Sequence, residues 1–295
     1  MERNRTIGIV GQGFVGSAVN AGMSKYFNVE TYDKYKDECS SVSGFEHLSQ
    51  VSDVIFVCLP TPMCEDGSCH LGILNDVLIE LNDIASLSDK HVQYCSTFVV
   101  KSTIPPGTTQ NWNNTLSHID IVFNPEFLTE ANAVDDYKNQ NRIVIGGPRD
   151  ATTIVKQVFK RAFPNVPVIK TSSSMAEMVK YTTNCFLATK VSFANEMYQI
   201  CEKLDLDYDK LIEYATNDDR LGYSHWNVPG PDGDFGYGGH CFPKDLSSLI
   251  HQATELGINP ILLQAVADKN NDVRVNRDWE GQEGRAVISN KNIEK

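Results

Sequence analysis

The first 170 residues alternate short apolar runs with longer segments of mixed character. Seven runs of four to six residues, most of them rich in Val and Ile, are predicted as strands: Thr6–Val10, Val29–Tyr32, Val54–Leu59, Phe98–Lys101, Ile119–Phe123, Arg142–Ile145 and Val166–Lys170. Continuous apolar strands are typical of a parallel sheet covered on both faces. The lengths between them match βαβ crossovers, so the pattern predicts an α/β fold.

After about residue 170, apolar positions recur every three or four residues, as on one face of a helix. One such stripe is predicted to face a core: Leu187, Val191, Ala194, Met197, Cys201 and Leu204. Ser174 and Glu177 have the spacing of a capping box at the start of this helix. Further helices are predicted at Tyr208–Ala215, Leu246–Leu256 and Ile261–Val275. We therefore expect a sheet domain over 1–170, an all-helical domain over 171–276, and a polar, poorly ordered tail over 277–295.

Composition fits two soluble domains. The 295 residues are 41% hydrophobic and 22% charged, with a formal net charge of −12. The acidic balance argues against nucleic acid as a partner. No apolar run reaches 18 residues and the first ten residues lack a signal-peptide pattern, so neither a membrane span nor secretion is expected. Eight cysteines without framework spacing indicate reduced thiols in the cytoplasm. Cys64, Cys69 and His70 do not complete a ligand set, so no metal is expected.

A glycine-rich motif follows the first predicted strand. Gly11, Gly13 and Gly16, with Phe14 and Val15 between the last two, form GxGxxG. A helix-compatible stretch follows, and Asp33 ends the second strand. This is the context of the dinucleotide-binding fingerprint: glycines for a tight turn and close backbone approach, and an acid for the ribose hydroxyls. The motif predicts a Rossmann-like domain that binds NAD rather than NADP, although Lys34 and Lys36 weaken that preference.

A second glycine-rich stretch, Gly236–Asp245, contains a cysteine at a predicted helix start. Three glycines precede Cys241, and Pro243, Lys244 and Asp245 follow it. Glycines let a bulky substrate reach the thiol. A helix N-terminus and a nearby lysine favour the reactive thiolate, and a carboxylate could handle protons or hold a water. The stretch predicts a nucleophilic cysteine.

Together these motifs resemble the UDP-glucose/GDP-mannose dehydrogenases, enzymes that oxidise the 6-hydroxymethyl of a nucleotide sugar to a carboxylate with two NAD⁺. The resemblance covers nearly the whole chain, in family order: Gly11–Gly16 with Asp33, Thr61-Pro62, Ser102–Gly107, Asn124–Glu130, Glu177–Asn184 and Gly238–Asp245. It implies NAD contacts from Gly11, Gly13, Phe14, Val15, Gly16, Asp33, Thr61, Pro62, Ser102, Thr103, Glu130 and Lys244. It also implies sugar-nucleotide contacts from Glu126, Lys180, Asn184, Arg220, Gly238 and Cys241.

The resemblance further implies a role for each catalytic residue. Cys241 would capture the aldehyde as a thiohemiacetal, which a second hydride transfer converts to a thioester. Glu126 would be the base for hydrolysis, and Thr103 and Asp245 would position the water. Lys180, assisted by Asn184, would stabilise the oxyanion of each intermediate. Arg220 would reach the substrate of a neighbouring subunit. The apolar helices after Ser174 need more cover than one small domain offers, so a homodimer formed through the helical domain is expected.

Elementary geometry supports some of these roles independently. Lys180 and Asn184 are four residues apart on one predicted helix and share a face, where a cation and an amide donor can form an oxyanion site. Glu126 and Glu130 follow a strand and lie at the carboxyl end of the sheet, where open α/β folds bind ligands. Thr103 also follows a strand, but taken alone it could be a turn residue.

Two features leave the function open. Family members have a third, UDP-binding domain, and residues 277–295 are too few to form it, so the chain is expected to be a short form. The β-hydroxyacid dehydrogenases, which perform one two-electron oxidation, share the sheet-plus-helices plan and the Lys-x-x-x-Asn pair. Cys241 argues against them, because a simple alcohol oxidation needs no nucleophile. A non-catalytic NAD-binding remnant is a third interpretation, opposed by the intact set of candidate catalytic residues.

Overall fold

The computed structural model describes residues 5–289, which form two compact units. Unit 1 comprises the chain up to Thr61 together with Leu71–Lys180. Unit 2 comprises Pro62–His70 together with the chain from Tyr181 onward. The helix α7 (Ser173–Leu204) contributes its first turns to unit 1 and the remainder to unit 2.

Within the described residues, unit 1 contains one sheet of seven strands. They are β1 (Thr6–Val10), β2 (Asn28–Tyr32), β3 (Val54–Val57), β4 (Thr97–Val100), β5 (Asp120–Phe123), β6 (Ile143–Gly146) and β7 (Val168–Thr171). Their order is β2-β1-β3-β4-β5-β6-β7. The first five strands are mutually parallel, which confirms the Rossmann-like prediction. β6 runs antiparallel to β5 through the pair Phe123–Gly146, and β7 is parallel to β6.

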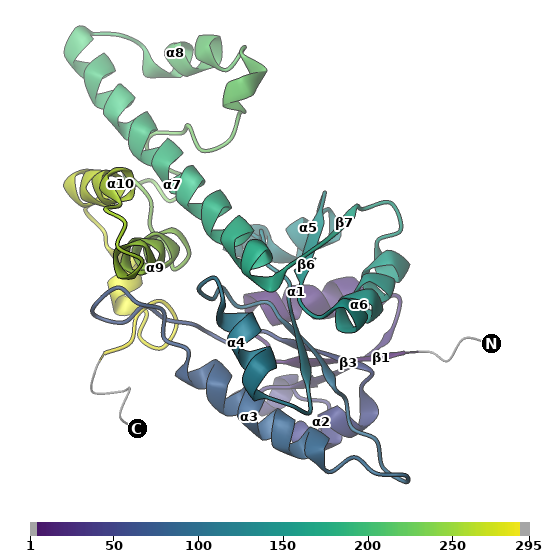
Figure 1. The fold of residues 1–295 in the computed structure, drawn as a ribbon. Coiled ribbons are helices and arrows are strands. Elements are labelled where there is room, and N and C mark those ends of the chain that lie inside the picture. Colours follow the sequence, from purple (N-terminus) through teal and green to yellow (C-terminus); the bar gives the residue numbers. More distant parts are fainter. Residues whose placement is uncertain (1–4, 290–295) are drawn as a thin grey trace. The chain divides into compact units, whose positions relative to one another are not determined.

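Helices cover both faces of this sheet (Figure 1). They are α1 (Phe14–Met23), α2 (Phe45–Val51), α3 (Gly72–Ser86), α4 (Thr108–Thr115), α5 (Ala133–Lys138) and α6 (Arg149–Ala162), with the short η1 (Asp37–Cys39) and η2 (Glu130–Asn132). Alternate strand residues point to opposite faces. Ile9 and Phe56 therefore pack with α1, α5 and α6, while Val10 and Val57 pack with α2, α3 and α4.

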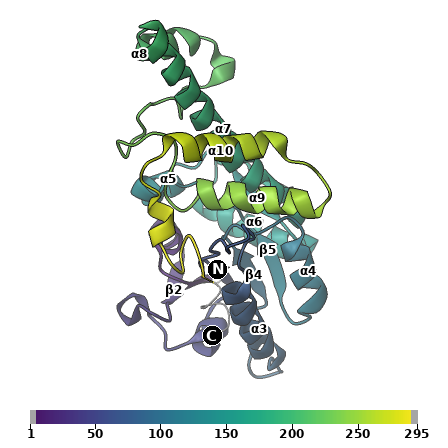
Figure 2. The same cartoon turned by 90° about the vertical axis from the view of Figure 1, so that its left-hand side faces the viewer.

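Unit 2 is helical in the part that the structure describes. Besides most of α7 it contains α8 (Tyr208–Ala215), η3 (Asp219–Leu221), α9 (Phe242–Glu255), α10 (Ile261–Val273) and η4 (Asp278–Gly281). α9 and α10 lie side by side (Figure 2). They pack on α7 through a core that includes Tyr181, Val191, Leu246 and Val266. No helix among residues 5–289 is long and apolar enough to cross a membrane.

Two local predictions about α7 are wrong. Leu204, assigned to the buried stripe of α7, is exposed, whereas Val191, Ala194 and Cys201 of that stripe are buried. Glu177 does not cap its own helix: Ser172 Oγ accepts from Met175 N at the start of α7. The Glu177 carboxylate instead accepts from Gly107 N (2.6 Å) and Thr109 N (2.9 Å) at the start of α4.

The predicted poorly ordered tail is also wrong as far as Ser289. Trp279, Ala286 and Ile288 are buried, because these apolar side chains interrupt the polar composition. The backbone around Ala286 and Ile288 pairs with Met63 in unit 2 (2.8 and 2.9 Å). Residues 290–295 of the predicted tail lie outside the described residues.

Candidate active site

The glycine loop of unit 1 lies between β1 and α1, where the sheet order changes direction. Gly11 has φ +86°, a left-handed conformation that favours glycine, and a Cβ at Gly16 would lie 1.9 Å from Gly11 O. Gly13 has open space around its Cβ position. Asp33 Oδ2 accepts from Gln12 N at 2.7 Å, so the predicted ribose-binding carboxylate is held beside the loop. Lys36 Nζ donates to Gln12 O (3.2 Å).

This loop fits the pyrophosphate of a dinucleotide. Gly13 is the N-cap residue of α1 and supplies no side-chain cap, and the first turn of α1 contains no acidic residue. The helix N-terminus is thus compatible with a phosphate, and no side chain at Gly13 stands in its way. Phe14 and Val15 form the first turn itself.

The segments after β3 and β4 contact each other at the carboxyl edge of the sheet. Leu59 N donates to Ser102 Oγ (3.1 Å), and Thr61 Oγ1 donates to Thr103 O (2.8 Å). Thr61 and Thr103 are buried. The structure therefore brings together three of the residues predicted to contact NAD. Pro62, the next in the chain, belongs to unit 2.

Glu126 and Lys180 form a buried ion pair in unit 1. Lys180 Nζ donates to Glu126 Oε1 (2.8 Å) and to Glu126 O (2.7 Å). The Lys180 side chain is only 3% exposed and the Glu126 side chain only 6%. Glu126 Oε2 accepts from Leu128 N (2.7 Å), which fixes the carboxylate. The structure thus joins the predicted base to the predicted oxyanion-stabilising cation.

Sequence reasoning missed a second buried lysine near this pair. Lys101 directly follows β4 and donates from Nζ to Asn124 Oδ1 (2.7 Å) and Asn124 O (3.3 Å). Burial lowers the pKa of Lys101 to about 8 and raises the pKa of the Cys58 thiol to about 12. The available signal was a lysine at the end of the otherwise apolar predicted strand Phe98–Lys101. Lys101 fixes the backbone two residues before Glu126.

Unit 2 holds a second buried polar cluster around Asp245. Asn184 Nδ2 donates to Asp245 Oδ2, and Lys244 Nζ donates to Asp245 Oδ1, both at 2.6 Å. Although burial alone lowers the pKa of Lys244, the Asp245 carboxylate raises it above its usual range, so the ammonium stays charged. Lys244 is predicted to contact NAD, and within unit 2 it is paired with Asp245.

Cys241 is the N-cap residue of α9, and its carbonyl accepts from Asp245 N (2.9 Å). Pro243 lies in the first turn, as predicted for a helix start. The thiol residue, the carboxylate and the Asn184 amide are therefore held on adjoining elements of one unit. Burial raises the pKa values of the Cys95 and Cys185 thiols. Cys241 is partly exposed.

The remaining predicted residues lie outside these clusters. Glu130 starts η2 and is exposed. The Arg220 side chain is 88% exposed and pairs with Asp218, with Nε 2.9 Å from Oδ1. Gly238 lies in the loop before Cys241. Among residues 5–289 no group of three or more His, Cys, Asp or Glu side chains could hold a metal ion.

Known proteins resemble both units. Residues 33–163 match the NAD binding domain of the UDP-glucose/GDP-mannose dehydrogenase family, and residues 174–272 match its central domain. UDP-glucose 6-dehydrogenase AglM of Haloferax volcanii is 36% identical over 258 residues, which are 82% of this chain and 57% of AglM. The chain spans about half the length of the curated relatives that it matches.

Solved structures agree. A UDP-glucose dehydrogenase of Pyrobaculum islandicum superposes with a TM-score of 0.81 at 26% identity, covering 92% of this chain and 68% of that one. A 3-hydroxyisobutyrate dehydrogenase of Mycobacterium tuberculosis covers 97% of both chains with a TM-score of 0.70; at 16% identity it shows the fold alone. The predicted cofactor, NAD, is confirmed by the match of residues 33–163. With both of its domains matched, the chain belongs to the UDP-glucose/GDP-mannose dehydrogenase family.

Proposed function

We propose that this chain oxidises the sugar 6-hydroxymethyl of a nucleotide sugar to the uronic acid, with Cys241 as nucleophile. One observation carries the proposal: unit 2 holds the N-cap cysteine, the buried Asp245 carboxylate and the Asn184 amide within one hydrogen-bonded cluster. A two-electron alcohol oxidation has no use for a cysteine presented in this way. The names of relatives such as AglM favour UDP-glucose as the substrate.

NAD, when bound, accepts a hydride from the carbon that is oxidised. The first oxidation leaves an aldehyde, to which the Cys241 sulfur adds as its proton passes to the carbonyl oxygen. The thiohemiacetal then loses its hydroxyl proton together with the second hydride, which passes to a second NAD⁺, and a thioester remains. Water then attacks the thioester carbon, releasing the carboxylate and restoring the thiol.

The other side chains have roles that match their environments. Lys180 and Asn184 lie four residues apart on α7, and each offers a buried N–H donor for a developing oxyanion. Glu126 is acceptor-only when ionised and accepts from Lys180 and Leu128 N, so it is held in place to take a proton from water. Asp245 and Thr103 are assigned to positioning that water.

Formation of NADH at 340 nm, with NAD⁺ and a panel of UDP- and GDP-sugars, tests this proposal. We expect turnover with UDP-glucose, and loss of overall turnover in Cys241→Ser. Cys64→Ser is the matched control, because Cys64 is a partly exposed thiol of unit 2 with no role in the proposal. Full activity of Cys241→Ser would support the two-electron alternative instead.

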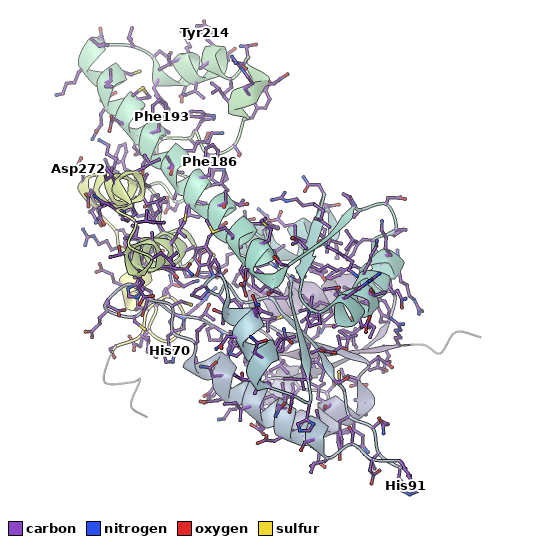
Figure 3. The ribbon with its side chains drawn as sticks, viewed as in Figure 1. His70, His91, Phe186, Phe193, Tyr214 and Asp272 are labelled. Atoms are coloured by element: carbon purple, nitrogen blue, oxygen red, sulfur yellow. The ribbon has the colours of Figure 1, made fainter. Side chains whose placement is uncertain are left out.

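We further propose that the chain forms a homodimer through α7. Phe186, Phe193 and Ile200 recur every seven residues along this helix and are 66%, 52% and 45% exposed. Figure 3 labels Phe186 and Phe193 on α7. A run of large exposed apolar side chains on one helix is typical of a contact surface. Phe193→Glu is expected to shift the mass in light scattering from dimer to monomer, whereas a monomeric wild type would contradict this proposal.

A further inference from the structure

The loop that precedes Cys241 contains few side chains that could hold its backbone in one conformation. Gly236, Gly238 and Gly239 make up half of the segment Gly236–Cys241. Gly236 and Gly239 adopt φ +67° and +68°, the left-handed region. Glycines lose more conformational freedom on folding than any other residue, so a glycine-rich loop needs contacts from elsewhere to hold one conformation.

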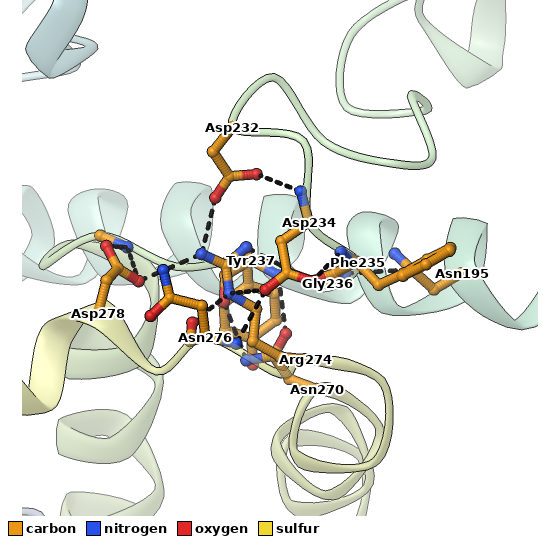
Figure 4. A network of polar contacts seen from close by, with 11 residues as sticks. Asn195, Asp232, Asp234, Phe235, Gly236, Tyr237, Asn270, Arg274, Asn276 and Asp278 are labelled. Carbon is orange, nitrogen blue, oxygen red and sulfur yellow. Dashed lines mark hydrogen bonds and ion pairs between the residues drawn. The ribbon is translucent and has the colours of Figure 1, made fainter.

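Those contacts come from side chains of three other elements of unit 2 (Figure 4). Gly236 N donates to Asn195 Oδ1 of α7 (3.0 Å). Asn270 of α10 binds both backbone groups of Tyr237: its Oδ1 accepts from N (2.7 Å) and its Nδ2 donates to O (3.0 Å). Gly239 N donates to the Asp278 carboxylate of η4 (3.0 Å to Oδ2). Side-chain amides and a carboxylate thus fix successive backbone groups of the loop.

A buried arginine connects these side chains. The Arg274 side chain is only 2% exposed; its Nη2 lies 2.7 Å from Asp232 Oδ2 and 3.2 Å from Asp278 Oδ1. Its Nε donates to Asn276 O (2.7 Å). A buried guanidinium with several fixed acceptors holds each acceptor in a defined place. Arg274 therefore sets the position of the Asp278 carboxylate that binds Gly239.

The loop and these side chains are fitted closely. A Cβ at Gly238 would lie 2.2 Å from Arg274 Nη2, and a Cβ at Gly236 would lie 2.3 Å from Asn270 Oδ1. The side chains packed against this loop thus require glycine at positions 236 and 238, whereas at Gly239 the left-handed φ favours glycine. We call Asn195, Asn270, Arg274 and Asp278 the loop frame.

We propose that the loop frame is a set of positioning residues that hold Cys241 at the N-terminus of α9 in its reactive orientation. The inference rests on the proposed function, in which Cys241 is the nucleophile. The frame acts through the loop backbone. Loosening it should allow the sulfur to sample orientations away from the helix terminus, where thiolate is less favoured.

Two near-isosteric variants test the frame. Asn270→Asp keeps the acceptor for Tyr237 N but removes the donor to Tyr237 O. Asp278→Asn keeps an acceptor for Gly239 N but removes the charge that pairs with Arg274. The matched controls are Asn271→Asp and Asp272→Asn, the same two exchanges at exposed neighbouring positions of α10. Arg274→Lys keeps the positive charge and removes the planar guanidinium. It replaces either frame variant that fails to fold.

Alkylation by iodoacetamide is the first readout, because it needs neither substrate nor turnover. Mass spectrometry of the Cys241 peptide gives its rate in the folded protein, with the Cys64 peptide as internal reference. We expect at least threefold slower alkylation of Cys241 in both frame variants, with Cys64 and both controls unchanged. Unchanged or faster alkylation of Cys241 in folded frame variants would overturn the proposal, whether or not any nucleotide sugar is turned over.

Steady-state kinetics provide the second readout. A frame variant should lower kcat at least tenfold. It should leave the KM for NAD⁺ within twofold of the wild-type value, because the glycine loop that fits the pyrophosphate belongs to unit 1 and is unchanged. A merely structural defect would lower the active fraction without slowing the alkylation of Cys241 in the folded protein. If the wild type turns over no nucleotide sugar but Cys241 is still alkylated more slowly in the frame variants, the proposed function is wrong and the positioning role of the loop frame is supported.

Discussion

The buried pair of Lys180 and Glu126 should show strong energetic coupling in unit 1. Removing either charge alone leaves the other buried, with 3% or 6% of its side chain exposed. Breaking a buried ion pair in this way costs about 3–5 kcal/mol. Glu126→Gln leaves the Lys180 ammonium facing a neutral amide and Glu126 O, and Lys180→Met leaves the carboxylate with Leu128 N.

The double variant removes both charges of the pair, so neither member is left as a buried charge without its partner. We expect it to cost no more free energy of unfolding than either single variant, which corresponds to a coupling energy of about 3 kcal/mol. The gross attraction supports this size, because two unit charges 2.8 Å apart interact by about 6 kcal/mol at an effective dielectric constant of 20.

Equilibrium urea unfolding of the wild type, the two single variants and the double variant provides the assay. Coincident transitions by circular dichroism and tryptophan fluorescence are needed before free energies are compared. The control is the same cycle at Lys210 and Asp207, an exposed pair, where we expect a coupling of about 0.5 kcal/mol or less. Additive effects at Lys180 and Glu126 would refute the reasoning.

Three further perturbations have defined outcomes. Gly13→Ala should weaken NAD binding, measured by calorimetry, roughly tenfold and leave the melting temperature unchanged, because the added Cβ meets only the space expected for pyrophosphate. Gly44→Ala is the control: its Cβ position is equally open, and neither the affinity for NAD nor the melting temperature should change. Glu177→Ala should lower the free energy of unfolding by about 2–4 kcal/mol, since two backbone N–H groups lose their acceptor, whereas exposed Glu80→Ala should stay within about 0.5 kcal/mol. The pKa of Lys101 is lowered to about 8 on folding, so the unfolded chain binds more protons than the folded protein above that pH. The free energy of unfolding of the wild type should therefore rise by about 1 kcal/mol relative to that of Lys101→Met between pH 7 and 9. A difference between the two proteins that does not change with pH would contradict this.

Much of unit 1 could be predicted because its signals are local. All seven strands were placed within two residues at each end, since β-branched runs and crossover lengths are read directly from the sequence. The glycine loop was predicted for the same reason: its geometry depends on residues that are adjacent in the chain. The position of Asp33 beside Gln12 follows from the parallel pairing of β1 with β2.

What escaped prediction depends on contacts between distant segments. Glu177 fits a local capping box, yet its carboxylate binds the start of α4, about seventy residues away in sequence. Lys101 looks like an ordinary strand end until Asn124 is placed against it. The apolar stripe of α7 gave no sign that Leu204 is exposed, because helical periodicity does not say where packing stops. Asn270 and Arg274 likewise act on a loop more than thirty residues earlier.

Some predictions remain to be tested, among them the domain boundary at residue 170, the homodimer, the cytoplasmic location and the role of each site residue. Arg220 illustrates why. Its exposed guanidinium pairs with Asp218 within one chain, and contact with the substrate of a neighbouring subunit requires that subunit. The light-scattering experiment on Phe193→Glu therefore precedes any test of Arg220.

The number of NADH molecules formed per molecule of sugar nucleotide tests the central claim most directly. With limiting UDP-glucose and excess NAD⁺, wild type should form two NADH per sugar, and Cys241→Ser should form no uronic acid. One NADH per sugar, with Cys241 dispensable, would contradict the thioester route and identify the chain as a two-electron dehydrogenase.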